Sequence, residues 1–468
     1  MRILLTTHQF LPEFSAGTEV LTFEVVRELQ RRGHDVRVLS GSPHLAESAQ
    51  TRGDDYAYEG IEVHRIRSLP VDSSIPAELV RREYDDPETA RQLDLIRTAW
   101  QPDLVHFFHL QRLTGSLVHR CADLSIPMVY TPTDFWAICP LNQLRLPDGS
   151  ACSGPSADSS NCILHLAMAG RHRNRAAFYR WIPDSLPGRM LRMIPRWLIR
   201  SRRLDAAREL QYRPRAMRVL LNEIDRVMPA TRFMAAQLEM HGASRKSLRS
   251  IAYGIDRTGY DNLGPVGTSE RLRIGFIGAL NANKGAHVLL AAAAMMHVDA
   301  AFSIEIYGDE TSDPDYTKCL RDRAVNDGRI RFCGTFERKT LPVILNRMDV
   351  VVVPSTWIEN MPLVVLGALT AGRPVIGSNV PGIAEVVTDG SNGYLFEIGD
   401  STRLASILQL LINDRDGLRM LASNTRPAKS IAQYTTELEQ LYDEVTAERQ
   451  ARRTFVLPSQ HSGPPEKK

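Results

Sequence analysis

Residues 350–396 read VVVVPSTWIENMPLVVLGALTAGRPVIGSNVPGIAEVVTDGSNGYLF, and this stretch decides the fold. The four valines from Val350 to Val353 predict a buried strand, after which a polar turn leads to a helix opened by Pro362. A second strand is expected around Pro374 to Gly377, followed by a loop punctuated by glycines. This alternation of apolar strand and helix is typical of an α/β protein.

Glu359 and Asn360 lie at the seam between the first strand and the helix. A carboxylate at this place can accept hydrogen bonds from a polyhydroxyl ligand. The free backbone N–H groups of the first helical turn, such as that of Leu363, can bind an anion. The stretch therefore offers one contact suited to a sugar and one suited to a phosphate.

The length and composition favour a soluble protein of two domains. A chain of 468 residues is too long for one ordinary core, and its 43% apolar and 24% charged content is typical of globular proteins. No run approaches the ~18 apolar residues of a membrane span, and a net charge of +3 is too small to indicate a nucleic-acid partner. The start, MRILLTTHQFLPEF, lacks the features of a signal peptide, so a cytoplasmic protein is expected.

Three runs in and around the opening stretch resemble the nucleotide-binding half of the family 4 retaining glycosyltransferases: P-S-x-W-x-E-N-x-P-L, A-G-x-P-V-I-G-S and P-G-x-x-E-x-V-x-D-G-x-x-G. The resemblance implies the GT-B fold, in which two Rossmann-like domains face each other across a cleft. It also implies a retaining transfer that needs no catalytic metal and no cofactor, because the nucleotide-sugar is a substrate. The donor-binding residues expected on this basis are Gly17, Gly278, Lys284, Thr335, Glu359, Asn360, Met361, Leu363 and Glu385.

The expected domain boundaries follow the pattern of strands, helices and glycine-rich connections. A strand at Ile3 to Thr7 and a helix opened by Gly17 form a βαβ unit whose glycine lets a ligand approach the backbone. Residues 1–265 are expected to form the first, acceptor-side domain, with an insertion at about 160–218. Residues 266–425 form the nucleotide-sugar-binding domain, 426–450 a helix that packs back toward the first domain, and 451–468 a disordered tail.

Two residues of the first domain are expected to act in the cleft. His109 follows a predicted strand at its carboxyl end, where open parallel sheets place their ligands, although a buried histidine bonded to backbone is an equal alternative for it and for His106. Asp134 lies in the run T-D-F-W-x-x-C-P, which resembles a cleft-facing segment of some relatives. Many of these have histidine before the aspartate, and Thr133 cannot replace its acid/base chemistry. The catalytic candidates are Glu359, Lys284, Asp134 and His109.

The run LRIGFIGALNANKGAHVLL predicts a second phosphate contact. Lys284 begins a helix beneath a strand end, where its charge and the exposed N–H groups act on the same anion. Two positions depart from the family pattern: Ala279 replaces a common arginine, and Gly367 replaces a second glutamate that usually binds the ribose. Either the ribose is held differently, or donor affinity is weaker, or catalysis has been lost. The alternative to an active glycosyltransferase is thus a degenerate GT-B protein that binds a nucleotide-sugar or a partner.

A group of cysteines predicts either a structural zinc site or buried free thiols. Cys162 and His165 stand at C-x-x-H spacing, and with Cys139 and Cys152 they would complete a tetrahedral ligand set. Free thiols in a reducing compartment are the alternative. The D-x-D run at Asp313 is interpreted as a helix N-cap rather than a metal site.

Arginines crowd the segment from Arg171 to Arg218, where aromatic and aliphatic residues lie between them. This composition is typical of a basic amphipathic surface, which could hold the enzyme on the inner face of an anionic membrane, near a lipid-linked saccharide acceptor. A helical insertion whose arginines are merely solvated explains the composition equally well.

Overall fold

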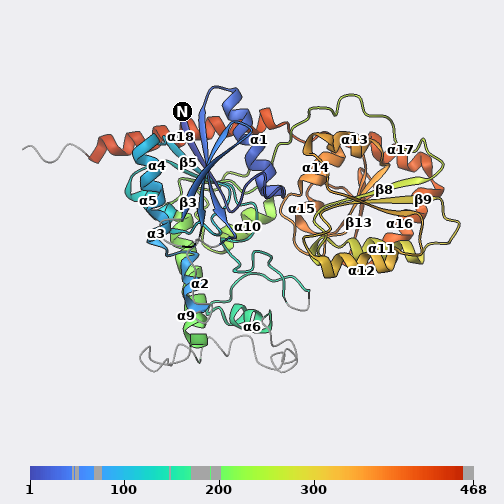
Figure 1. Cartoon of the computed structure of the whole chain (residues 1–468), viewed down its shortest axis with the longest axis horizontal. Coiled ribbons are helices and arrows are strands. Elements are labelled where there is room, and N and C mark those ends of the chain that lie inside the picture. The colour runs from blue at the N-terminus through green and yellow to red at the C-terminus, as the bar shows by residue number, and fades with distance from the viewer. Residues whose placement is uncertain are drawn as a thin grey trace, which may run out of the picture.

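The computed structural model describes residues 1–44, 47, 52–67, 76–146, 149–169, 190 and 202–456. Two separate sheets divide them into two domains that lie side by side (Figure 1). Both sheets are parallel apart from one edge strand, and helices cover them, as expected for two Rossmann-like domains.

The first sheet has the strand order β3-β4-β2-β1-β5-β6-β7. Its parallel strands are β1 (Arg2–Thr7), β2 (Asp35–Ser42), β4 (Ile61–Arg67), β5 (Leu104–Phe107), β6 (Met128–Tyr130) and β7 (Arg226–Val227), and β3 (Gly53–Tyr58) pairs antiparallel with β4. The central strands are buried on both faces, which explains their continuous apolar runs. The edge strand β7 is only two residues long.

The helices of the first domain lie against this sheet or extend away from it (Figure 1). They are α1 (Gly17–Arg31), α2 (Pro76–Arg82), α3 (Pro87–Ala90), α4 (Gln92–Trp100), α5 (Ser116–Asp123), α6 (Ser160–Ala169), α9 (Arg202–Glu223) and α10 (Arg232–Met240).

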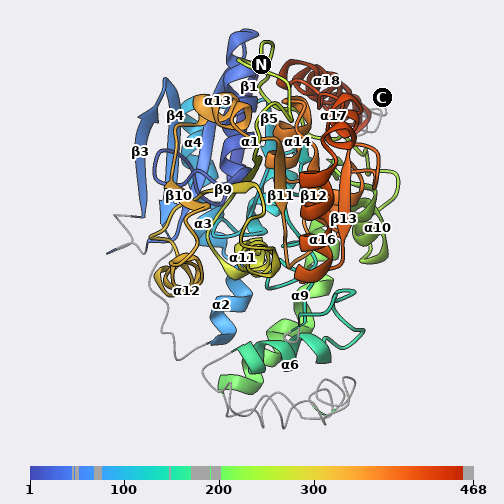
Figure 2. The same cartoon turned by 90° about the vertical axis from the view of Figure 1, so that its right-hand side faces the viewer.

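The second sheet has the order β10-β9-β8-β11-β12-β13, with all pairs parallel (Figure 2). Its strands are β8 (Leu272–Ile277), β9 (Phe302–Tyr307), β10 (Ile330–Gly334), β11 (Val350–Val353), β12 (Val375–Ser378) and β13 (Gly393–Phe396). Its helical elements are η4 (Ala282–Lys284), α11 (Ala286–Met295), α12 (Pro314–Ala324), η5 (Arg338–Thr340), α13 (Leu341–Asn346), α14 (Leu363–Thr370), α15 (Pro381–Ala384), α16 (Ser401–Asn413) and α17 (Arg415–Ser423).

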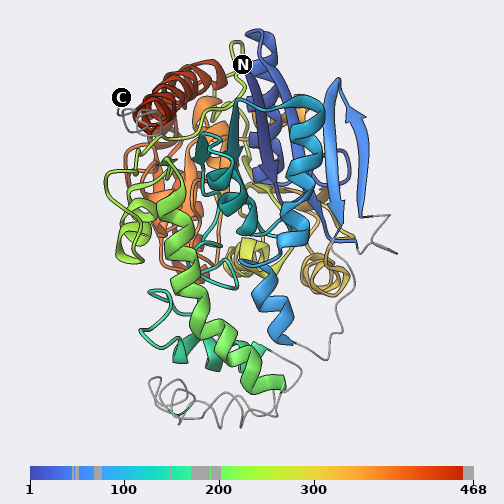
Figure 3. The same cartoon turned by 90° about the vertical axis from the view of Figure 1, so that its left-hand side faces the viewer.

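Helix α9 revises the expected extent of the arginine-rich insertion. Its second half packs into the core of the first domain through Met217, Leu220 and Leu221, and Arg213 is fully buried there. Its first half extends away from the body beside α2 and α6 as an arm (Figure 3). Residues 170–189 and 191–201 lie outside the described residues, and so does most of the predicted basic surface.

The last helix, α18 (Ile431–Val456), lies across the first domain beside α1 (Figure 1). Tyr434, Leu438 and Tyr442 are fully buried in the core of that domain. Because α18 continues to Val456, the prediction of a tail from residue 451 is wrong for its first six residues. Residues 457–468 lie outside the described ranges.

Two connections join the domains and run next to each other. The backbone N–H of Ile255 donates to the carbonyl of Lys429 at 3.0 Å, and the N–H of Ile431 donates to the carbonyl of Ile255 at 2.7 Å. Within the described ranges, no helix is both long and apolar enough to cross a membrane.

Candidate functional site

The site lies where the carboxyl ends of the two sheets meet. Pro132 follows β6 and Asn360 follows β11, and the Asn360 side chain donates a hydrogen bond to the Pro132 carbonyl at 2.9 Å. In parallel sheets all strands end at the same edge, so this contact brings together the two edges at which such folds bind ligands.

His109 and Asp134, both predicted from the sequence, form a pair on the first domain. Nδ1 of His109 accepts a hydrogen bond from the Gln111 N–H at 3.0 Å, which assigns the ring proton to Nε2. Nε2 then donates to Oδ2 of Asp134 at 2.8 Å, and Oδ1 of Asp134 accepts from the Trp136 N–H at 2.8 Å. These bonds fix both side chains, with His109 only 2% exposed.

His8 and Glu19 extend this pair and were not predicted as site residues. The His8 ring lies 4.4 Å from that of His109, and its Nε2 is 3.3 Å from Oε1 of Glu19. Burial raises the pKa of Glu19 above its ordinary value and lowers that of His8 well below its own. The nearby Arg112 cation lowers the pKa of His8 further and opposes the rise at Glu19. A glutamate on the apolar face of a predicted helix is the signal that could have found Glu19.

His106 is a buried, hydrogen-bonded histidine of the core and not a residue of the site. Its ring is fully buried between the hydroxyls of Tyr442 at 2.7 Å and Thr131 at 2.8 Å, and burial lowers its pKa to about 3. Thr133 donates its hydroxyl to the Phe108 carbonyl at 3.3 Å. Neither residue takes part in the pair of His109 and Asp134.

Lys284 and Glu359 form the matching pair on the second domain. The Lys284 ammonium donates to Oε1 of Glu359 at 2.7 Å and lies 4.8 Å from the centre of the Trp357 ring. The same oxygen accepts from the Ser355 hydroxyl and the Trp357 indole N–H, each at 2.7 Å. Three donors thus orient one carboxylate that is only 5% exposed. Sequence reasoning missed Ser355 and Trp357, although both stand in the motif.

A glycine lets the Lys284 turn approach β11. Gly285 has φ +74°, and a Cβ built on it would lie 1.8 Å from the Pro354 carbonyl oxygen. No other residue fits there, because an L side chain would meet both the strained dihedral and the backbone. The close approach holds Lys284 against the residues that follow β11.

Four further positions follow strands of the two sheets, one in the first domain and three in the second. Helix α14 begins at Leu363 with Pro362 as its N-cap, one residue later than expected, and no side chain caps it. A Cβ built on Gly17 would meet no atom within 4 Å, and one on Gly278 would meet none closer than 3.8 Å. Thr335 is exposed in the loop after β10. These positions leave room for a ligand and offer N–H groups to an anion.

Asn360, Met361 and Glu385, which were expected to contact the donor, have partners at the interface between the domains. Besides the Pro132 carbonyl, the Asn360 amide donates to the Tyr253 hydroxyl at 3.0 Å, so both of its protons are used inside the interface. Its Oδ1 accepts from the Thr231 hydroxyl at 3.1 Å. Met361 is buried in the core of the first domain. Asn360 and Met361 therefore join the domains, because the strand end that faces the cleft also forms the interface.

Glu385 caps a helix of the opposite domain. Its two carboxylate oxygens accept from the backbone N–H groups of Arg232 and Phe233, at 2.8 and 2.9 Å, in the first turn of α10. A carboxylate at this place satisfies otherwise unpaired donors and stabilises the helix dipole.

Tyr260 takes the space next to the missing second glutamate. A Cβ built on Gly367 would lie 3.2 Å from the Tyr260 hydroxyl oxygen.

An ion pair joins the two domains near Tyr260: the Arg338 guanidinium of the second domain lies 2.6 Å from the Glu24 carboxylate on α1. Burial raises the pKa of Glu24 to about 7, although the Arg338 cation opposes the shift.

A second bridge crosses the cleft at Arg145. Its guanidinium donates to Oδ1 of Asn283 at 3.2 Å and to the Thr356 hydroxyl at 3.4 Å. Arg145 belongs to the segment after β6 that also carries Asp134.

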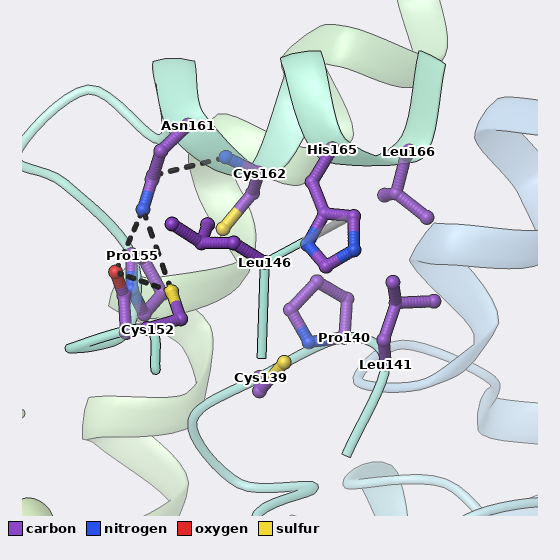
Figure 4. Close-up of a pocket in the computed structure, with 11 residues that line it drawn as sticks. Cys139, Pro140, Leu141, Leu146, Cys152, Pro155, Asn161, Cys162, His165 and Leu166 are labelled. Atoms are coloured by element: carbon purple, nitrogen blue, oxygen red, sulfur yellow. Dashed lines mark hydrogen bonds between the residues drawn. The ribbon is translucent and has the colours of Figure 1, made fainter. Parts of the chain in front are cut away.

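The four predicted zinc ligands line one small cavity between this segment and α6 (Figure 4). In the part of the chain that the structure describes, no group of three His, Cys, Asp or Glu side chains is already arranged to hold a metal. The interpretation of the D-x-D run as a helix N-cap is confirmed: Asp313 caps α12 by accepting from the Tyr316 N–H at 3.1 Å.

Comparison with protein families gives matches to both halves of the chain. A model described as "Glycosyl transferase 4-like domain" matches residues 16–254, about half of the chain, and one described as "Glycosyl transferases group 1" matches residues 271–414. The chain is 22% identical to a glycogen synthase of Mycobacterium tuberculosis over 422 residues. This match covers 88% of this chain and 86% of that protein. It is 34% identical over 150 residues to a D-inositol 3-phosphate glycosyltransferase of Corynebacterium urealyticum, which covers 31% of this chain and 35% of that protein.

Solved structures share the fold over nearly the whole length. Anabaena HepE in complex with UDP and glucose has a TM-score of 0.60 at 18% identity, over 94% of this chain and 99% of that one. Sucrose-phosphate synthase from Thermosynechococcus elongatus has a TM-score of 0.64 at 16% identity, over 96% of this chain and 100% of that one. The expected GT-B fold is confirmed, and the chain belongs to the family 4 glycosyltransferases.

Proposed function

We propose that this chain is a retaining glycosyltransferase that moves a sugar from a UDP- or GDP-sugar to a polysaccharide or a lipid-linked saccharide. Transfer of sugar from a nucleotide-sugar follows from the family. The observation that carries the site is the paired arrangement of Lys284 with Glu359 on the second domain, on the same strand-end edge that meets His109 and Asp134 of the first. UDP as the nucleotide is supported by the HepE structures with UDP and with UDP-glucose.

In the proposed reaction the protein orients groups and stabilises charge, without a covalent intermediate and without a metal. Lys284 and the N–H groups that begin α14 would bind the diphosphate and stabilise the charge that grows on it as it leaves. The leaving phosphate oxygen takes the proton of the acceptor hydroxyl on the same face of the sugar, which retains the anomeric configuration.

Glu359 would hold hydroxyl groups of the donor sugar. Its fixed orientation supports this role, because a carboxylate that is already aligned loses little freedom on binding. His109 and Asp134 would contact the donor sugar or the acceptor from the opposite domain.

The hydroxyl of Tyr260 would meet the ribose in place of the absent second glutamate. Its position beside Gly367 supports this assignment. A Tyr260→Phe variant keeps the ring and removes only the hydroxyl, so it should weaken UDP binding without a loss of stability. Unchanged UDP affinity would contradict the assignment.

The function is tested by transfer of radiolabelled sugar from a panel of UDP- and GDP-sugars to a cell-envelope extract. We expect transfer from at least one donor, loss of transfer in Glu359→Gln, and an unchanged anomeric configuration by NMR. Brief addition of EDTA to the assay should leave the rate unchanged. Donor binding with no transfer to any acceptor would instead indicate a degenerate, non-catalytic protein.

We further propose that the arm formed by α2 and α9 rests on an anionic membrane. Leu79, Leu204 and Tyr212 are exposed along it, and the sequence between its helices is rich in arginine. Each basic side chain near such a surface contributes ~1 kcal/mol of binding. Co-sedimentation with vesicles that contain anionic lipid should exceed that with neutral vesicles, and equal sedimentation would refute the proposal.

A further inference from the structure

A small cavity outside the cleft brings together three thiols and one imidazole. Cys139 comes from the loop after β6, Cys152 from an irregular stretch, and Cys162 and His165 from α6 (Figure 4). The cavity measures about 10 Å³, close to the least that holds one water molecule. Its other walls include the apolar side chains of Leu141, Leu146 and Leu166.

The donor set has the composition of a structural zinc site. Three cysteine sulfurs and one histidine nitrogen form a closed tetrahedral shell for zinc, with no position left for a substrate. Cys162 and His165 are three residues apart on α6, a spacing that puts both side chains on one face of a helix. None of the six cysteines forms a disulfide within the described ranges.

An outer hydrogen bond is also present. Nδ2 of Asn161 lies 3.9 Å from Sγ of Cys152 and donates to the Gly154 carbonyl at 2.8 Å. Second-shell donors of this kind orient metal ligands and stabilise thiolate charge.

We propose that Cys139, Cys152, Cys162 and His165 bind one zinc ion. The four residues line the cavity, but no three of their side chains are placed to hold a metal as they stand. Binding therefore requires side-chain rotation, as expected where metal binding and local folding are coupled.

The site would fix a segment that reaches the cleft at two points. Asp134 lies five residues before Cys139, and Arg145 lies between the first two ligands. Asp134 holds His109, whereas Arg145 crosses to Asn283 and Thr356 of the second domain. The segment has little regular backbone pairing before α6, so a metal would serve as its internal tie. This is a structural role, separate from the transfer reaction.

The test is the metal content of the full-length protein, purified with zinc in the growth medium and without a metal-affinity tag. We expect one zinc per chain by mass spectrometry of the metals, background zinc in Cys162→Ser, and retained zinc in His165→Cys, which exchanges one ligand for another. Cys319→Ser is the matched control, because Cys319 is exposed and lies in the other domain. Replacement by Co²⁺ should give the intense visible absorption of tetrahedral thiolate coordination.

Zinc at background level in the folded wild-type protein, even after incubation with ZnCl₂, would overturn the proposal. So would a disulfide between any two of the three cysteines in the protein as isolated, detected by mass spectrometry without reduction. Equal zinc in wild type and Cys162→Ser would place the metal elsewhere. Because the readout is metal content, it is independent of whether a donor or acceptor has been found.

Discussion

Replacing Asn360 with alanine removes three hydrogen bonds from the interface between the two domains. The amide donates to the Pro132 carbonyl and the Tyr253 hydroxyl and accepts from the Thr231 hydroxyl, at 2.9, 3.0 and 3.1 Å. Each buried hydrogen bond contributes about 1 kcal/mol net. The free energy of unfolding should therefore fall by about 3 kcal/mol.

Urea titration followed by tryptophan fluorescence measures this loss, with Asn379→Ala as the control. Asn379 lies in the same domain but is exposed, so its replacement should change the free energy of unfolding by less than about 0.5 kcal/mol. Calorimetric titration with UDP completes the experiment. We expect UDP affinity in Asn360→Ala to stay within about twofold of wild type, because Lys284 and the first turn of α14 belong to the second domain alone.

The opposite pattern would refute the structural assignment. If Asn360→Ala unfolds at the wild-type urea concentration and binds UDP much more weakly, the Asn360 side chain contacts the donor, as the sequence motif predicted. A loss of both properties in Asn379→Ala would show that the assay reports general damage to the domain.

Three further predictions concern the charged groups at the cleft. Lys284→Met should lower kcat/KM by roughly 10²- to 10³-fold, because a fixed charge that stabilises the leaving group is lost. Lys318→Met removes an exposed lysine and should leave kcat/KM unchanged. Equal kcat/KM for the two variants would contradict the assignment of Lys284. The carboxyl of Glu24 ionises near 4.5 when unfolded and near 7 when folded, so the folded chain holds the extra proton between these values. The free energy of unfolding should thus fall as pH rises from about 5 to about 7, and a Glu24→Gln variant with the same slope would disprove this origin. Glu385→Ala should lower the free energy of unfolding by about 1 kcal/mol through loss of a helix cap, measured against Glu397→Ala, and no difference between the two would exclude capping.

Local patterns predicted most of the strands and the pairs at their ends. The valine run of β11 and the apolar strands β5 and β8 are buried on both faces, so their sequences carry a strong signal. His109 lies two residues after β5 and Lys284 seven residues after β8, which is why their place at the ligand-binding edge could be predicted. Strand β3 was missed because it lies at the edge of its sheet and alternates only partly buried with exposed residues.

The roles of Asn360 and Arg213 could not be predicted from the sequence, because they depend on partners that lie far away in the chain. Asn360 stands beside Glu359, yet its hydrogen-bond partners lie more than 100 residues earlier in the chain. Arg213 reads as one of many surface arginines, but Glu83 and the carbonyl of Trp136 neutralise and bind it in the core. No local periodicity distinguishes a charged residue with such partners from a solvated one.

The position of α18 has a consequence for how the protein is made. The core of the first domain includes Tyr434, Leu438 and Tyr442, which the ribosome adds only after the whole of the second domain. Domains usually fold in order as the chain emerges, but here the first half leaves the ribosome with an apolar face that only the final helix covers. Until translation reaches residue 456, the nascent chain exposes this face, which is a natural target for chaperones. A gene truncated before α18 should accordingly yield insoluble protein rather than an isolated domain.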